Sequence, residues 1–569
     1  MKYACRDARN GRSASNSARR LLLRACAVLL GLTPFLLLEV GLHLFDVARP
    51  ADSSDPLSGF NRTFPLFERH GSVYRTAQAR EPFFPPQEFS AKKPTNGFRI
   101  FCLGGSTVHG HPYQSPTSFP AWLELELAGS DPTRMYQAVN CGGVSYASYR
   151  LRPIVQEVLQ YQPDLIIVAT GENEFLEDRT YQSLKARPVL WARVQNAAYS
   201  LRIFNLARSF LLPLPAAERG EGRGEGFNRN APLPREVRTM LDDRSGYASY
   251  HRDDAWHERV RMQFEESMRA MVSICRDARV PIILIKLGSN LRDCPPFKSE
   301  HKSGLSVSDE AAWEANFDAA TAAGKTDLNQ ALAHYLKAEA LDDEYALLDF
   351  RIARALDLLG RKSEALPYYL KARETDICPL RLIKPHEDII ARIAAETKTP
   401  VVDAAAFLAS SSPDHIPGND SYLDHVHPNI GGHQKIAQGI AAQMRAAGII
   451  PQSKPWSEPE RQSAYARQLG RLGPAYFSDG RRRVDWLEGW ARRERLFEET
   501  LPQDAPGYLR LGFRRLDLDD DDGAAEAFRE ALHRDDRCAE LMRQHAQELF
   551  SQGREESARW LTRHFEPGR

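Results

Sequence analysis

The run Leu165-Ile166-Ile167-Val168-Ala169 is continuously apolar and is followed directly by Thr170-Gly171. A second run, Ile282-Ile283-Leu284-Ile285, has the same character. Strands that are apolar on both faces are typical of a parallel sheet that helices cover on both sides. These two runs therefore predict the centre of a parallel α/β sheet.

Further short apolar runs extend this predicted sheet along the chain. The other expected strands are Arg99–Leu103, Tyr136–Asn140 and Pro400–Val402, and the run at 282–285 widens to Pro281–Lys286. Helical stretches such as Trp256–Ala278 lie between them. Strands that alternate with helices argue for an α/β fold with a parallel sheet.

The motif Gly104-Gly105-Ser106-Thr107 comes directly after the first of these strands. The two glycines allow a sharp turn, which presents the Ser106 hydroxyl at the carboxyl end of the strand. The same pattern also fits a glycine-rich turn that Ser106 or Thr107 caps. Taken alone, this motif does not decide between a nucleophile and a cap.

The motif Asp424-His425-Val426-His427 lies late in the chain, before a helix-like run. Three-residue spacing on a turn lets Asp424 hold one imidazole nitrogen of His427, while the other nitrogen takes a serine proton. The alternatives are a solvated loop, or a metal site formed by Asp424, His425 and His427. A zinc site needs three or four ligands, and only this cluster is evident. With Ser106 considered alongside it, the motif favours catalysis without a metal or organic cofactor.

Two further segments offer donors for an oxyanion. Asn173 follows the most apolar strand, where its side-chain amide can donate to developing negative charge. Gly142 and Gly143 follow Val139-Asn140-Cys141 and each offer a backbone N–H. The alternative for both segments is ordinary turn chemistry.

The order Ser, Gly, Asn, Asp-x-x-His resembles the SGNH (GDSL-type) hydrolase family, over roughly 98–176, 256–300 and 380–445. The resemblance implies a three-layer α/β/α, flavodoxin-like fold. It implies that Ser106 is the nucleophile and adds its own N–H to the oxyanion hole. Asn173 and Gly143, or its neighbour Gly142, would supply the other donors, and His427 with Asp424 would complete the triad.

Two positions depart from the family pattern. The usual Gly-x-Asn-Asp is here Gly171-Glu172-Asn173-Glu174, so the last acidic side chain is longer. The doubled glycine Gly142-Gly143 is followed by Val144-Ser145-Tyr146, where a further glycine is common. We favour Gly143 as the glycine of the hole.

The N-terminus has the composition of a signal anchor. Residues 1–24 contain one Lys, six Arg and a single Asp, and an apolar run extends from Leu21 to Phe45. As a helix, this run would measure roughly 37 Å, enough to cross a bilayer. The basic flank is predicted to stay in the cytoplasm, which places the chain after the apolar run outside it. A cleaved signal peptide and a soluble amphipathic helix are the alternatives.

An internal repeat interrupts the α/β pattern. Gln330–Ala338 (QALAHYLKA) recurs as Glu364–Ala372 (EALPYYLKA) at an offset of 34 residues, the period of tetratricopeptide repeats. Ala524–Leu532 resembles the second helix of such a repeat. Generic antiparallel helices are the alternative. Because a helical repeat buries its face only against neighbours, these arrays would pack on the α/β domain or on a protein partner.

The chain as a whole looks like membrane-anchored bacterial SGNH proteins that carry tetratricopeptide repeats. This resemblance implies a single-pass protein of the bacterial inner membrane, with its catalytic domain in the periplasm. The expected segments are a cytoplasmic basic segment at 1–20, a transmembrane signal anchor at 21–46, a stalk at 47–97, the first part of the hydrolase domain at 98–304, a tetratricopeptide-like helical insertion at 305–377, the second part of the hydrolase domain with the Asp-x-x-His motif at 378–450, and a helical C-terminal region at 451–569.

Cys294 and Cys378 flank the insertion in loop-like sequence. An extracytoplasmic location would permit disulfides. We therefore expect a Cys294–Cys378 bridge at the base of the insertion.

Three functions fit these motifs. The first is an extracytoplasmic esterase acting on an ester-bearing substrate such as an acylated glycan or lipid. The second is an O-acetyltransferase of an envelope glycan, which would use the same serine. The third is a repeat scaffold on an inactive core.

The formal net charge is zero, with 75 basic and 75 acidic residues. Nucleic-acid binding would require a cluster of basic residues, and the sequence does not indicate one.

Overall fold

The computed structural model describes residues 30, 31, 33–42, 44, 65–185, 202–203, 249–452, 456–491, 504–517, 521–551 and 555–565. The chain divides into two compact units, which are described separately. One comprises 1–64 and 183–226, and the other comprises 65–182 and 227–569.

A five-stranded parallel sheet forms the centre of the larger unit, in the order β5-β4-β6-β7-β8. The first strand of this sheet in chain order therefore lies between the second and the third, which is the flavodoxin-like arrangement. The predicted α/β fold class is confirmed. The strands are β4 (Gly97–Gly104), β5 (Met135–Gly142), β6 (Leu165–Ala169), β7 (Ile282–Lys286) and β8 (Val401–Asp403).

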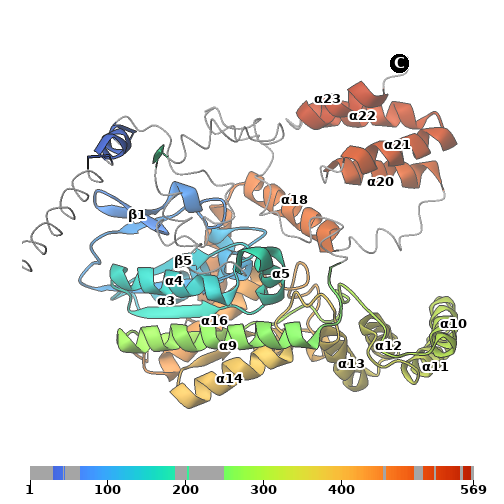
Figure 1. Cartoon of the computed structure of the whole chain (residues 1–569), viewed down its shortest axis with the longest axis horizontal. Coiled ribbons are helices and arrows are strands. Elements are labelled where there is room, and N and C mark those ends of the chain that lie inside the picture. Colours follow the sequence, from blue (N-terminus) through green and yellow to red (C-terminus); the bar gives the residue numbers. More distant parts are fainter. Residues whose placement is uncertain are drawn as a thin grey trace, which may run out of the picture. The chain divides into compact units, whose positions relative to one another are not determined.

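Helices cover both faces of this sheet (Figure 1). On one face α3 (Phe119–Ser130) packs against α16 (Ile430–Ala446), next to α15 (Ala404–Ser411). On the other face α9 (Asp254–Asp277) lies between α4 (Ser148–Val158) and α14 (Lys384–Thr397).

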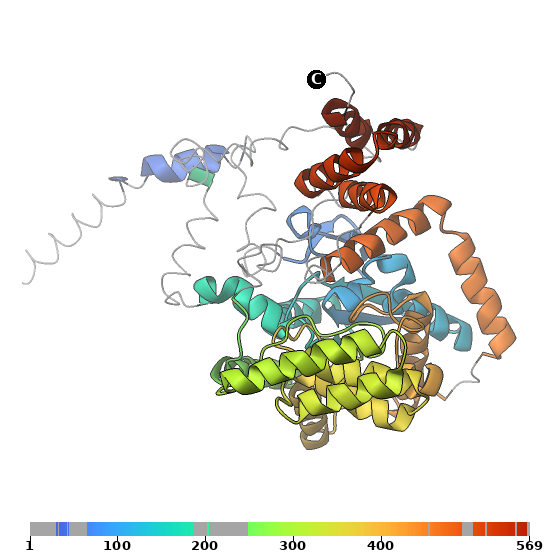
Figure 2. The same ribbon diagram turned by 90° about the vertical axis from the view of Figure 1, so that its right-hand side faces the viewer.

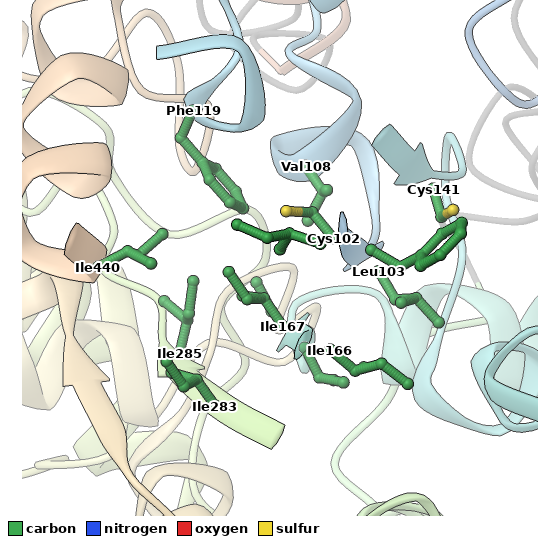
Figure 3. Close-up of a cluster of buried hydrophobic side chains, with 14 of the residues drawn as sticks. Cys102, Leu103, Val108, Phe119, Cys141, Ile166, Ile167, Ile283, Ile285 and Ile440 are labelled. Atoms are coloured by element: carbon green, nitrogen blue, oxygen red, sulfur yellow. The ribbon is translucent and has the colours of Figure 1, made fainter. Parts of the chain in front are cut away.

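The strands are apolar on both faces because both faces are covered. All residues of β6 are buried. Cys102, Ile167 and Ile283 form one row across three strands, and Phe119 of α3 and Ile440 of α16 lie near them in the core (Figure 3). Burying a side chain of this size contributes about 1.5–3 kcal/mol of folding free energy.

The described part of the segment that we expected to be a stalk packs on the α/β domain. Residues 47–64 lie outside the described residues, but β1 (Phe67–His70), β2 (Val73–Thr76) and β3 (Glu88–Ser90) form an antiparallel sheet. The Phe67 and Phe89 rings pack on Tyr161 at centroid distances of 5.9 and 5.6 Å. The Glu157 carboxylate of α4 accepts the Leu66 N–H at 2.8 Å.

The insertion is a helical array with its own apolar core. It comprises α10 (Val307–Ala323), α11 (Leu328–Glu339), α12 (Ala346–Leu358) and α13 (Lys362–Glu374). Each helix packs on the next one in the chain, and Figure 2 shows α10 and α11 side by side. The Asp357 carboxylate of α12 accepts hydrogen bonds from Arg292 at 2.9 Å and from Tyr369 at 3.0 Å, so the array is attached to the loop after β7.

The predicted Cys294–Cys378 disulfide is wrong. Both residues lie in the described part of the chain, where no bridge joins them. The Cys294 S–H donates to the Pro295 carbonyl at 3.7 Å. Cys378 is buried in an apolar cluster, and burial raises the pKa of its thiol well above the usual range.

A carboxylate closes the base of the insertion instead. Asp376 accepts the backbone N–H groups of Phe297 at 2.7 Å, Lys298 at 3.0 Å and Cys378 at 3.0 Å. The Ile377 N–H donates to the Lys298 carbonyl at 2.9 Å. Since these bonds already hold the two ends of the insertion together, a covalent bridge is not needed to close it.

The C-terminal region is helical, as expected. The helices α17 (Glu458–Gly470) and α18 (Pro474–Ala491) continue the larger unit, and the Tyr465 ring of α17 packs on Trp122 of α3 at 4.8 Å. A further cluster has a separate apolar core. Its helices are α20 (Ala505–Asp517), α21 (Asp521–Arg534), α22 (Cys538–Ser551) and α23 (Glu555–Phe565).

The predicted anchor at 21–46 is described only in part, because residues 21–29, 32, 43, 45 and 46 lie outside the described residues. The described positions from 30 to 44 are helical. Within the described stretches, no helix combines the length and the apolar character that crossing a membrane requires.

Candidate active site

The turn that carries Ser106 lies where the order of the strands in the sheet reverses. Ser106 begins the short helix α2 (Ser106–His109), directly after β4, and Asn173 follows the neighbouring strand β6. In open α/β sheets this crevice, at the carboxyl ends of strands whose connections diverge, is the usual ligand site. The fold therefore brings two predicted site residues to the expected place.

Gly105 is required by its neighbours rather than by its backbone conformation. A Cβ atom at this position would lie 2.5 Å from Asn173 Nδ2 and 2.9 Å from Glu172 Oε1. Any larger residue would push the Asn173 amide away from the serine turn. The glycine before the serine thus sets how closely the two segments approach.

Ser106, His427 and Asp424 form a continuous hydrogen-bonded line. His427 Nε2 lies 2.7 Å from Ser106 Oγ, and His427 Nδ1 lies 2.6 Å from Asp424 Oδ2. All three residues are buried. With the proton on Nδ1 facing the carboxylate, Nε2 is positioned to accept the serine proton.

Asp424 also shapes the loop that carries His427. Its Oδ1 atom accepts the N–H groups of Val426 at 2.9 Å and His427 at 2.8 Å. Burial alone would raise the pKa of this carboxyl, but His427, His425 and these hydrogen bonds lower it well below its usual range. Asp424 therefore remains a carboxylate, which stabilises an imidazolium at His427.

His425 lies beside Asp424 but is not part of the line from Ser106 to Asp424. Its Nδ1 lies 3.6 Å from Asp424 Oδ2, and its ring packs edge-on against Phe297 at 4.9 Å. Burial lowers the pKa of His425 to about 3, so the ring is neutral. No set of three His, Cys, Asp or Glu side chains within the described ranges is arranged to hold a metal ion.

The two glycines predicted for the oxyanion hole are already engaged. The Gly142 N–H donates to Asn140 Oδ1 at 2.9 Å, and the Gly143 N–H donates to the Gly104 carbonyl at 2.9 Å. The prediction that Gly143 or Gly142 donates to an oxyanion is therefore wrong, because the Asn140 side chain and the Gly104 carbonyl take these two N–H groups.

Ser145 adopts a backbone conformation that is usual for glycine. Its φ angle is 60°, in the left-handed region that favours glycine. It stands where the resemblance commonly has a further glycine, a signal visible in the sequence. The next carbonyl, that of Tyr146, accepts a hydrogen bond from Asn173 Nδ2 at 3.3 Å. The residue after Ser145 therefore contacts the Asn173 amide.

The two glutamates flanking Asn173 differ in role. Glu174 accepts the Ser148 N–H at 2.8 Å and the Ser148 hydroxyl at 2.9 Å, so it caps the start of α4. This contact accounts for the longer acidic side chain at that position. Glu172 is 2 % exposed, and its carboxyl oxygens have no hydrogen-bond partner outside the residue itself. Sequence reasoning assigned it no part.

Helix α18 contacts the loop that follows α2. Arg483 donates to the Pro112 carbonyl at 2.7 Å, and the Tyr476 hydroxyl lies 2.8 Å from Thr117 Oγ1. The same loop carries His111, whose ring packs edge-on against His427 at 5.2 Å. Helix α18 thus packs against the loop that carries His111.

No protein-family model and no curated protein sequence matches this chain. Solved structures that are similar include a lipolytic protein of the G-D-S-L family from Desulfitobacterium hafniense, at 11% identity over 61% of this chain and 98% of that one, with a TM-score of 0.25. A lipase/acylhydrolase from Enterococcus faecalis is 13% identical over 63% and 99%, with a TM-score of 0.26.

A catalytic mutant of an acetylxylan esterase from Geobacillus stearothermophilus is also similar, at 13% identity over 62% of this chain and 96% of that one, with a TM-score of 0.26. TM-scores below 0.5 leave the functional argument to the geometry of the site.

Proposed function

We propose that this protein is a serine esterase that cleaves ester bonds through an acyl-enzyme. The observation that carries this proposal is the line of hydrogen bonds from Ser106 through His427 to Asp424, at 2.7 and 2.6 Å. A buried carboxylate, an oriented imidazole and a serine at the end of a strand together make an activated nucleophile.

Acylation begins when Ser106 Oγ attacks the ester carbonyl carbon and His427 Nε2 takes the hydroxyl proton. The carbonyl oxygen then carries a negative charge. His427 next gives its proton to the leaving alcohol as the tetrahedral intermediate collapses. Water, activated by the same imidazole, hydrolyses the acyl-serine and restores the free enzyme.

We assign three donors to the oxyanion. They are the backbone N–H groups of Ser106 and Ser145 and the side-chain amide of Asn173. The bond from Asn173 Nδ2 to the Tyr146 carbonyl is long, at 3.3 Å, so the amide can turn to an oxyanion at low cost.

The substrate and location are expectations from the N-terminus. A basic flank and an apolar run support a signal anchor, which would place the esterase outside the cytoplasm, facing envelope esters such as acylated glycans or lipids. Apolar side chains along the described N-terminal helix are exposed, including Leu30 at 78% and Leu37 at 67%. A bilayer would cover such a surface.

The helical insertion is proposed to be a tetratricopeptide-like array that binds a protein partner. The two repeated sequences fall in α11 and α13, the second helices of the pairs α10–α11 and α12–α13. Each pair packs closely, and α11 packs on α12, as stacked repeats do.

The test is intact-protein mass spectrometry of the chain after incubation with a fluorophosphonate, together with turnover of acetyl and butyryl esters. We expect one adduct on Ser106 and measurable hydrolysis. Ser106→Ala should abolish both while the fold remains. Activity within tenfold of wild type in that variant would contradict the mechanism. Transfer of the acyl group to a glycan in preference to water would instead identify an acyltransferase.

A further inference from the structure

The carboxyl group of Glu172 lies beside Gly105, next to the Asn173 amide. Its Oε1 atom and the Asn173 amide contact the same glycine, Gly105, with distances of 2.9 and 2.5 Å to the Cβ that glycine lacks. Asn173 is one of the donors proposed for the oxyanion. Glu172 is thus next to the developing charge, although at 2 % exposure it is not itself open to substrate.

The turn that carries Glu172 cannot readily release the side chain to solvent. Gly171 has a φ angle of 129°, and a Cβ at this position would lie 2.4 Å from Leu382. On the other side of Glu172, Glu174 is bonded to Ser148 at the start of α4. Fixed points on both sides therefore hold the carboxyl in its buried position.

Burial without a partner favours the neutral form of a carboxyl group. Loss of solvent raises the pKa of Glu172 to about 7, and the hydrogen bond from its own backbone N–H and the charge of His427 only partly oppose this effect. His427 is the ionisable group that faces Glu172 from another element. The groups that share the Gly105 position with Glu172, which are the Asn173 amide and the Tyr146 carbonyl, carry no charge.

We propose that Glu172 is a positioning residue that must carry its proton for the esterase to work, and that loss of this proton switches the site off. This inference rests on the proposed esterase function. A neutral carboxyl supports Gly105 and Asn173 without opposing an oxyanion. A carboxylate in the same place would set a like charge a few ångströms from that oxyanion.

The sign of the effect follows from which charge is nearer. Ionised Glu172 would attract the imidazolium of His427 and repel the oxyanion held by Asn173. We take the repulsion as the larger effect, because Glu172 Oε1 and the Asn173 amide adjoin the same glycine, Gly105. In a site of low dielectric the repulsion would reduce kcat/KM by about 10- to 100-fold.

The experiment compares kcat/KM for a simple acetyl ester between pH 5 and pH 9 in wild type, E172Q and the exposed control E266Q. Wild type and E266Q should lose activity as the pH rises through about 7, the pKa of Glu172. E172Q, which keeps the shape and cannot ionise, should retain its activity at high pH. An unchanged alkaline loss in E172Q, or a loss at every pH, overturns the inference.

Two further measurements keep the test independent of how E172Q folds. A wild-type profile that stays flat up to pH 9 overturns the inference by itself. Unfolding gives a second readout, because Glu172 ionises near 4.5 in the unfolded chain and near 7 in the folded one. Wild type should therefore lose stability relative to E172Q between these pH values and match it at lower pH. If wild type neither hydrolyses esters nor labels at Ser106, the proposed function fails instead.

Discussion

His427 Nε2 lies 2.7 Å from Ser106 Oγ, although 321 positions of the chain separate the two residues. Ser106 is held by the turn after β4, and His427 by the loop before α16. Helix α16 packs on α3, which follows the serine turn in the chain. The sheet and this helix pair therefore set a distance that neither motif could set alone.

Asp424→Asn should lower kcat by about 10⁴-fold and change KM little, because asparagine can impose the wrong tautomer on His427. The asparagine oxygen can still accept the N–H groups that Asp424 Oδ1 accepts from Val426 and His427, so the loop should keep its shape. Steady-state kinetics with an acetyl ester, alongside circular dichroism, measures both effects. Asp414→Asn, at an exposed carboxylate, is the matched control.

The same kinetics also tests the metal alternative for the Asp424, His425 and His427 cluster. Dialysis against a chelator should leave kcat unchanged, since both Asp424 oxygens are used by His427 and the backbone. Activity that is lost on chelation and restored by zinc or manganese would assign the cluster to a metal.

Asn173→Ala should reduce kcat by about 10²- to 10³-fold, the usual effect of removing one oxyanion donor. Labelling of Ser106 by a fluorophosphonate should slow as well, because that reaction also develops negative charge on an oxygen. Asn96→Ala, on an exposed turn, should change neither rate. Wild-type kinetics in the Asn173 variant would remove this amide from the mechanism.

Glu177→Gln should destabilise the fold strongly. Glu177 pairs with Arg150, both side chains are 1% exposed, and its second oxygen accepts the Ala147 N–H at 3.1 Å. Breaking such a buried pair costs about 3–5 kcal/mol. Chemical denaturation measures the loss, with Glu266→Gln as the control, because its partner Arg152 lies 3.9 Å away at the surface. Equal stability of the two variants would show that the buried pair contributes little.

Cys294 and Cys378, at the base of the insertion, should be free thiols, so a reducing agent should have no effect on the protein. A reducing agent should leave the melting temperature unchanged, because Asp376 rather than a disulfide joins the two ends. Cys378 should react with a maleimide only after unfolding, since burial raises the pKa of its thiol. A peptide linked through Cys294 and Cys378 in a non-reducing digest would contradict this expectation.

Much of the fold could be predicted because its signals are local. The predicted strand Leu165–Ala169 matches β6 residue for residue, and Pro281–Lys286 differs from β7 by one residue. A strand that is apolar throughout indicates burial on both faces. The three-residue spacing of Asp424 and His427 on a turn indicates a carboxylate that faces an imidazole. Ser106, Asn173, Asp424 and His427 are therefore brought together as their motifs predicted.

The errors arose where the outcome depends on partners distant in sequence. The sequence predicts Gly143 as an oxyanion donor, but in the structure its N–H donates to the Gly104 carbonyl. The sequence predicts a disulfide between Cys294 and Cys378, but in the structure hydrogen bonds to Asp376 join the same two ends. Each of these side chains or N–H groups has several acceptable partners, and packing selects among them.

By itself, the sequence determined the alternation of strands and helices, the motif residues and their order along the chain, because periodicity and turn chemistry act between near neighbours. Only the tertiary structure decided which N–H groups remain for an oxyanion, that Ser145 takes the left-handed conformation, and that Glu172 is buried beside Gly105. Hydrogen-bond competition and loss of solvent depend on every element around a group, and a linear pattern does not carry that information.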